Sequence, residues 1–220
     1  MNIENKKEFA RQIVSLLKAH YPDSKVALNF TNSWELLVAV VLSAQCTDER
    51  VNQVTRSLFK KYKTVEDYAK ADLREFEQDI KSTGFYKNKA KNIINIAKII
   101  LDKYGGKVPN KMEELLKLPG VARKTANIVL GNAFGIVEGI AVDTHVRRLA
   151  KRLGLSDKND PVKIEKDLME IFDRKDWFKV TYMLIDHGRE ICEAKKPRCD
   201  KCFLNEICPS AFKFPHFEKS

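Results

Sequence analysis

The chain has 220 residues, of which 44% are hydrophobic, and this is enough apolar material for one large globular core or two small ones. Lysine and arginine number 40 and aspartate and glutamate 30, so the net charge of +10 favours a polyanionic partner such as nucleic acid. The N-terminus lacks the apolar stretch of a secretory signal, and no apolar run approaches the roughly 20 residues that span a bilayer. The sequence therefore predicts a soluble, intracellular protein without a membrane partner.

The dominant pattern is helical, because apolar residues recur with a period of 3.6 along most of the chain. The clearest helical faces lie within residues 9–17, 51–62, 93–101 and 146–150. Residues 34–45, WELLVAVVLSAQ, are ambiguous, since their valines suit a buried strand, but their length and start signal favour a buried helix. The sequence therefore predicts an all-α fold.

Helix boundaries can be predicted from capping residues. Asn32, Asp72 and Asn110 each stand three residues before a glutamate, which is the spacing of a capping box, and Asp160 precedes a proline. Helix ends are expected at six glycines, because glycine readily adopts the left-handed conformation that terminates a helix. These are Gly84, Gly105, Gly106, Gly135, Gly154 and Gly188.

Residues 118–127, LPGVARKTAN, predict a helix, a tight hairpin and a second helix. Pro119 and Gly120 form the bend, and Lys124 falls in the first turn of the second helix. A cation is disfavoured there by the positive end of the helix dipole, so the lysine requires a reason beyond helix stability. The hairpin and the helix start expose backbone N–H groups, which can hold a nucleic-acid phosphate without reading sequence.

Four cysteines lie close together near the C-terminus, in the segment CEAKKPRCDKCFLNEIC. Cys192, Cys199, Cys202 and Cys208 are separated by six, two and five residues. In a chain without a secretory signal, this grouping indicates a metal site more than disulfides. Zinc and an iron–sulfur cluster fit the spacing about equally well, and a disulfide-linked tail is the third alternative. Cys46 stands apart and is expected to be a small buried residue.

Two further segments complete a pattern. AVDTHVRRLAKRLG, residues 141–154, offers Asp143 as the N-cap of a basic helix, and LSAQCTDERVNQ supplies Gln45 at the end of a buried element. With the hairpin lysine and the four cysteines, these segments resemble the endonuclease III family of DNA repair glycosylases, within the helix-hairpin-helix superfamily. The resemblance runs in the same order from about Leu36 to Cys208.

The resemblance implies a fold and a cofactor. The fold is all-α with two helical domains and a DNA-binding groove between them. Residues 25–137 would form a six-helix barrel that carries the helix-hairpin-helix, and residues 1–24 and 138–220 would form the second domain. Lys124 matches the catalytic lysine of the family and Asp143 its catalytic aspartate. The four cysteines match the ligands of a [4Fe–4S] cluster.

The resemblance also indicates DNA contacts. Gln45 matches the residue that fills the gap left by an extruded nucleotide, and Phe85, in KSTGFYKNKA, stands where an aliphatic wedge is expected. His145 and His187 fit either phosphate contacts or helix packing. Ala122 replaces a glycine that is common in such hairpins. The remaining predicted contacts are Gly120, Ala122, Arg123 and Thr125 of the hairpin, with His145 and the basic residues Lys195, Lys196 and Arg198.

Three functions fit these features. The first is a bifunctional glycosylase and abasic-site lyase that excises oxidised pyrimidines through a lysine Schiff base and cleaves 3′ to the site by β-elimination. The second is a monofunctional adenine glycosylase of the same superfamily, which typically lacks the lysine. The third is a non-catalytic helix-hairpin-helix DNA-binding protein. The first function implies a monomer that acts on double-stranded DNA with a damaged base or an abasic site. Such a protein is expected in the cytoplasm and, in a bacterium, associated with the nucleoid.

Overall fold

The computed structural model describes residues 3–217. Within them the chain is helical and contains no β-strand, which confirms the predicted all-α class. It divides into two compact units. The central unit runs from Ala27 to Glu138, and the terminal unit combines the chain up to Val26 with the chain from Gly139 onward. Among the described residues, no helix combines the length and apolar character that a bilayer span requires.

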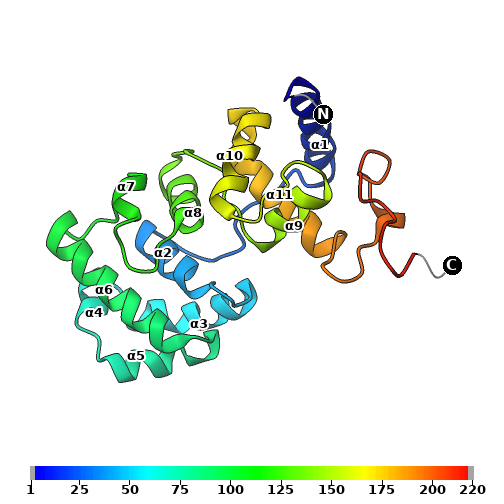
Figure 1. Cartoon of the computed structure of the whole chain (residues 1–220). Helices are drawn as coiled ribbons and strands as arrows, with labels where there is room; N and C mark the ends of the chain where they lie inside the picture. The colour runs from blue at the N-terminus through cyan, green and yellow to red at the C-terminus, as the bar shows by residue number, and fades with distance from the viewer. Residues whose placement is uncertain (1–2, 218–220) are drawn as a thin grey trace. The chain divides into compact units, whose positions relative to one another are not determined.

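In the central unit, the short helices α4 and α5 pack against the long helix α6, and α2 packs against α8 (Figure 1). Its helices are α2 (Ser33–Leu42), α3 (Asp48–Lys61), α4 (Val65–Ala69), α5 (Leu73–Asp79), α6 (Tyr86–Tyr104), α7 (Met112–Leu115) and α8 (Arg123–Phe134), with the 3-10 turn η1 (Lys81–Thr83). Four aromatic rings, Trp34, Tyr62, Tyr68 and Phe76, meet in its core with neighbouring centroids 5.1 to 5.7 Å apart.

Helix α2 resolves the ambiguous segment of the sequence. Its residues from Leu36 to Leu42 are all buried, so apolar side chains cover every side of the helix. A helix enclosed in this way shows no polar face, which explains why its composition also suited a buried strand. The Glu35 N–H donates to Asn32 Oδ1 at 2.9 Å, and this bond confirms the predicted cap.

The terminal unit joins the two ends of the chain. Its helices are α1 (Ile3–His20), α9 (Thr144–Arg152), α10 (Pro161–Ile171) and α11 (Trp177–Glu190), with the 3-10 turns η2 (Arg174–Asp176) and η3 (Cys199–Lys201). Helix α1, blue in Figure 1, packs against α10 and α11, and α9 packs against α11. Ile13, Leu17, Val146, Leu149 and Met183 are completely buried in the shared core.

Two predicted boundaries are wrong. Asn110 is exposed and caps nothing, because α7 is a short helix whose N-cap position is held by Lys111. Gly188 does not end a helix but lies buried inside α11. A Cβ at Gly188 would approach His145 Nδ1 to 3.0 Å and Arg148 Nη2 to 3.1 Å. Glycine is therefore needed there for the close approach of α9 to α11, not for a turn.

Candidate active site and cysteine loop

The predicted hairpin lies between α7 and α8. Its turn is closed by the Val121 N–H, which donates to Leu118 O at 3.2 Å. Gly120 has a φ of +78°, in the left-handed region that favours glycine. A Cβ on Gly120 would lie only 2.5 Å from Asn92 Nδ2, so the α6 side chain rests directly on the glycine. Both the backbone conformation and the packing therefore require glycine at the bend.

Helix α8 begins immediately after the hairpin. Ala122 is its N-cap with a φ of −98°, so alanine adopts this position without left-handed strain. Alanine has no side-chain oxygen, and it leaves the first-turn N–H groups without the cap that Asn32 gives α2 or Asp143 gives α9. Lys124 is half-buried in this first turn. The structure thus places a lysine in the first turn of a helix that has no side-chain cap.

The other predicted hairpin residues differ in exposure. Ala122 and Gly120 are exposed, Arg123 is half-buried and Thr125 is buried. The first three can meet a ligand at the surface. The Thr125 side chain packs inside the unit, so its contact to DNA would be limited to its backbone N–H.

The two candidate wedge residues share an unusual backbone. Gln45 has a φ of +53° and Phe85 a φ of +48°, although neither is a glycine. Such conformations cost about 1–3 kcal/mol each and are concentrated at functional sites. Both side chains are exposed, and 64% of Phe85 is accessible, which is unusual for a large apolar residue. Cys46, beside Gln45, was expected to be a small buried residue, but it is only half-buried.

Asp143 lies at the start of α9 in the terminal unit. Its Oδ1 accepts a hydrogen bond from the Val146 N–H at 2.8 Å, so the predicted N-cap is present. His145 is half-buried in the next turn, with Nδ1 3.2 Å from Arg148 Nη2. Burial lowers the pKa of His145, Asp143 opposes the shift and Arg148 adds to it. Burial thus disfavours the charged form of the His145 side chain, and the cap at Asp143 holds the start of its helix.

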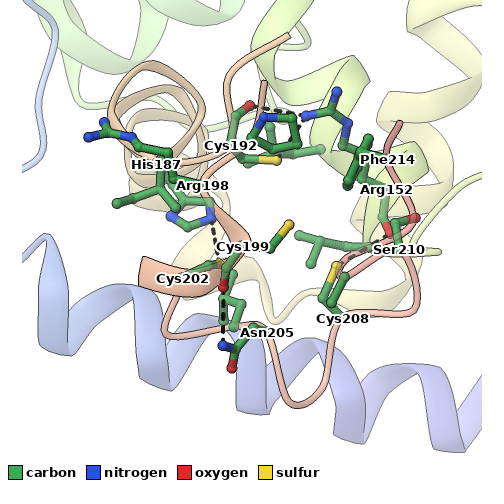
Figure 2. A pocket seen from close by; sticks show the side chains of 16 residues that line it. Arg152, His187, Cys192, Arg198, Cys199, Cys202, Asn205, Cys208, Ser210 and Phe214 are labelled. Atoms are coloured by element: carbon green, nitrogen blue, oxygen red, sulfur yellow. Dashed lines mark hydrogen bonds between the residues drawn. The ribbon is translucent and has the colours of Figure 1, made fainter. Parts of the chain in front are cut away.

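The four C-terminal cysteines surround one cavity. Figure 2 shows the side chains of Cys192, Cys199, Cys202 and Cys208 around a common space. This space holds about 400 Å³ that is not filled by protein atoms, part of it open to solvent. All the cysteines are free thiols, so the disulfide alternative is wrong. Within residues 3–217, no three His, Cys, Asp or Glu side chains have the arrangement that a metal ion requires.

Burial controls the chemistry of these thiols. It raises the pKa of Cys202 to about 11 and also raises the pKa of Cys208. His187 Nε2 lies 3.5 Å from Cys202 Sγ, and His187 is only 2% exposed with a pKa lowered by burial to about 4. Of the two alternatives for His187, packing is therefore confirmed, and a phosphate contact is wrong.

Residues 192–208, which carry the four cysteines, form the cysteine loop, and two arginines of α9 hold its start. Arg152 Nη1 donates to Cys192 Sγ at 3.2 Å and to Glu193 O at 2.7 Å (Figure 2 labels Arg152 and Cys192). Arg148 Nη2 donates to Gly188 O at 2.7 Å and to Cys192 O at 3.0 Å. The basic helix was recognised in the sequence, but its role in holding this loop was missed, because the contacts span about 40 residues.

The basic loop follows Cys192. Lys195, Lys196 and Arg198 are all exposed, and Arg198 Nε lies 3.6 Å from Glu193 Oε1. An exposed ion pair of this kind contributes only about 0–1 kcal/mol to stability. Arg198 can therefore leave Glu193 for a phosphate group. The predicted residues thus lie in four places: the hairpin, the loops that carry Gln45 and Phe85, the start of α9 and the cysteine loop.

Comparison with known proteins identifies the family. Residues 38–174 match the family model described as HhH-GPD superfamily base excision DNA repair protein. An endonuclease III of Synechocystis sp. is 51% identical over 207 residues, which cover 94% of each chain. The chain belongs to the endonuclease III family.

Solved endonuclease III structures agree with this assignment. The structure of a non-covalent endonuclease III–DNA complex has a TM-score of 0.91 and 46% identity, covering 94% of this chain and 97% of the other. The structure of a trapped endonuclease III–DNA covalent intermediate matches with the same values. The chain is thus a base excision repair enzyme, a DNA glycosylase and abasic-site lyase whose substrate is DNA. Of the first functional hypothesis, the combined glycosylase and lyase activity in base excision repair is confirmed.

Proposed function

We propose that Lys124 is the nucleophile of both the glycosylase and the lyase step. Its amine attacks the anomeric carbon of a damaged nucleotide and expels the base, which leaves a Schiff base between lysine and sugar. The Schiff base acidifies the adjacent sugar proton, and β-elimination then breaks the bond to the 3′ phosphate. The observation that carries this proposal is the position of Lys124, half-buried in the first turn of a helix that follows a tight hairpin.

The hairpin would bind a phosphate of the substrate strand. Gly120 lets the backbone turn without a side chain in the way, and the first N–H groups of α8 have no capping oxygen from Ala122. Backbone donors bind phosphate without reading sequence, which suits an enzyme that meets its lesion in any sequence. Arg123 adds a cation in the same turn.

Asp143 would act as proton acceptor and stabilise the positive charge that develops on the sugar. Its carboxylate is half-buried and oriented by the hydrogen bond from the Val146 N–H. An oriented carboxylate is better placed for this role than a mobile one, because it needs no reorganisation during the reaction.

Gln45 and Phe85 would enter the DNA stack when the damaged nucleotide leaves it. Extrusion costs a few kcal/mol, and a side chain that fills the vacated space recovers part of that cost. Both residues are exposed on strained backbone, which supports this assignment. Phe85 supplies a flat apolar surface for stacking against a base, whereas Gln45 supplies hydrogen-bonding groups.

The four cysteines would hold a [4Fe–4S] cluster. They fit such a group because their side chains line one cavity from a single loop. Burial raises the pKa of Cys202, so a thiolate at this position needs a positive charge nearby. Arg152 donates to Cys192 Sγ, and one arginine cannot compensate the charge of four thiolates. When bound, the cluster would supply the positive charge that keeps the thiolates ionised and would tie four points of the loop together.

The cysteine loop would present Lys195, Lys196 and Arg198 to the DNA backbone. Lysine and arginine contacts to phosphate release condensed counterions, so they add affinity that is independent of sequence. His145 would contribute from the start of α9, where it is half-buried near Asp143.

The substrates would be oxidised pyrimidines and abasic sites in double-stranded DNA, acted on by a monomer. The preference for pyrimidines is implied by the family resemblance, and the lyase activity by Lys124. Because its substrate is DNA, the protein would work in the cytoplasm, and with the nucleoid if its source is a bacterium.

Borohydride reduction in the presence of abasic DNA tests the proposed function. A Schiff base is reduced to a stable amine, so the protein should become covalently attached to the oligonucleotide. Peptide mapping of the adduct should locate the DNA on the peptide that contains Lys124. An adduct on another lysine, or none at all, would contradict the assignment.

A further inference from the structure

Lys89 is a buried lysine that the proposed chemistry does not use. It lies in the first turn of α6 and is only 5% exposed. Its Nζ donates to Leu42 O and to Thr83 O, both at 2.8 Å. These acceptors are neutral carbonyl oxygens, and burial lowers the pKa of Lys89. A dehydrated ammonium is costly, so its retention in a core calls for a reason.

The two acceptors stand where the two candidate wedge loops begin. Leu42 is the last residue of α2, three residues before Gln45. Thr83 is the last residue of η1, two residues before Phe85. The Lys89 N–H also donates to Phe85 O at 3.2 Å. One side chain thus joins the starting points of both loops, which are otherwise separated by about 40 residues of sequence.

The two hydrogen bonds of Lys89 Nζ favour a rigid connection between the two loops. The carbonyl of Leu42 belongs to the negative end of the α2 dipole, and a cation is favoured there. Hydrogen bonds from a charged donor are about twice as strong as neutral ones, and burial excludes the water that would compete for them. Of the neighbouring titratable groups, Cys46 acts on Lys89, and a thiolate there would favour the ammonium.

We propose that Lys89 is a positioning residue that fixes Gln45 and Phe85 as one two-pronged element, so that both enter the duplex together. This inference rests on the proposed function of these two residues. Lys89 touches neither DNA nor the reacting sugar in this account. It acts on the extrusion of the nucleotide and leaves the attack by Lys124 unchanged once the nucleotide is out of the stack.

The test compares two substrates for Lys89→Met, which keeps the length and removes the donors. The first is a duplex that contains one oxidised pyrimidine opposite its normal partner, and it requires extrusion. The second is a single-stranded oligonucleotide that contains an abasic site, in which no base pair must be opened. We expect single-turnover excision from the duplex to fall between about 10- and 100-fold, the range for losing hydrogen bonds to a charged group. Borohydride trapping on the single strand should change less than about twofold.

A double-mutant cycle separates positioning from general stability. In a protein that already carries Gln45→Ala and Phe85→Ala, Lys89→Met should reduce duplex excision by less than about twofold, because nothing remains to be positioned. A residue that only stabilises the fold would act on both substrates and in both backgrounds. Equal losses on the two substrates, or additive effects in the cycle, would overturn the inference.

Folding must be controlled, since the variant lacks a buried ammonium. If Lys89→Met loses its helical circular dichroism, Lys89→Gln, which keeps a polar side chain but removes the charge, replaces it in the same two assays, and the same contrast between substrates is expected. Failure of the proposed function would appear differently, as a lack of trapping by the unaltered protein on either substrate.

Discussion

The hairpin with α8 and the cysteine loop are held in different ways. Helix α8 packs against α2 and is anchored by four buried apolar residues, Ala126, Ile128, Val129 and Leu130. After α11, the described chain up to residue 217 contains only the three-residue turn η3, and few of its side chains are buried. The chemistry-bearing lysine is therefore placed by the fold itself. The cysteine loop is held by hydrogen bonds from two arginines, by the buried Leu204 and by the group that its thiols would bind.

Because of this difference, changes in the two regions should affect different properties, the reaction in one case and the folding of the terminal unit in the other. A change in the hairpin should alter the reaction while the fold persists, because Lys124 contributes little to the core. A change in the cysteine loop should alter the order of the terminal unit, because Leu204 is buried in the core of that unit and Cys202 and Cys208 pack against it. The following predictions test this contrast, beginning with the largest expected effect.

Lys124→Gln should abolish borohydride trapping and strand cleavage, since glutamine has no nucleophilic amine. The thermal midpoint should stay within a few degrees, as expected for a residue outside the core. Lys117→Gln, an exposed lysine just before the hairpin, serves as the control and should trap normally. Residual trapping by Lys124→Gln at the wild-type level would remove the nucleophile from the hairpin.

Asp143→Asn should slow base excision by about 10²- to 10⁴-fold, the usual contribution of a positioned acid or base. Asparagine is also a good N-cap, so α9 should remain folded. Asp160→Asn is a matched control, because Asp160 caps α10 through the Lys163 N–H at 2.9 Å. If both variants lose activity equally, or neither does, Asp143 is only a cap.

Cys199→Ala should leave the purified protein without the brown colour of a [4Fe–4S] cluster, whereas the unaltered protein should carry about four iron and four sulfide per chain. The terminal unit should lose stability and become sensitive to proteolysis in the cysteine loop, because its four attachment points are gone. Cys46→Ala, a cysteine outside the loop, should keep colour and protease resistance. A colourless parent protein with stoichiometric zinc would contradict the iron assignment and leave the lysine chemistry intact.

Gly120→Ala should cost more than Gly135→Ala, although both glycines have a left-handed φ, +78° and +67°. At Gly135 an added Cβ meets no described atom within 4 Å, so only backbone strain of about 1–2 kcal/mol is expected. At Gly120 the added Cβ also collides with the Asn92 amide. Chemical denaturation measures the two stabilities, and DNA affinity should fall for Gly120→Ala alone. Equal losses of stability would show that Asn92 moves aside freely.

Lys196→Ala should give the smallest effect, a reduction of about 1 in the slope of log affinity against log salt concentration. The loss should be similar for damaged and undamaged DNA, because a phosphate contact does not read the base. Lys166→Ala on α10 removes the same charge from an exposed position and controls for net charge. An identical slope for Lys196→Ala and the parent would mean that the basic loop is only a solvated surface.

The sequence by itself determined the features whose physics is local. The all-α class follows from a period of 3.6, and the caps at Asn32, Asp72 and Asp160 follow from hydrogen bonds that span three residues. The left-handed turn at Gly120 is likewise a property of one residue. The choice of Lys124 and Asp143 as site residues also came from the sequence, through a family resemblance that depends on local motifs.

Only the tertiary structure decided the features that join distant segments. Gly188 is a packing contact of α11 with α9, so its local appearance as a helix stop was misleading. His187 is buried beside Cys202, and Asn92 lies on Gly120. Lys89 reads as one more cation on an amphipathic helix until its Nζ is found on Leu42 O, 47 residues away. No local pattern encodes such contacts, because they depend on which helices meet and how closely.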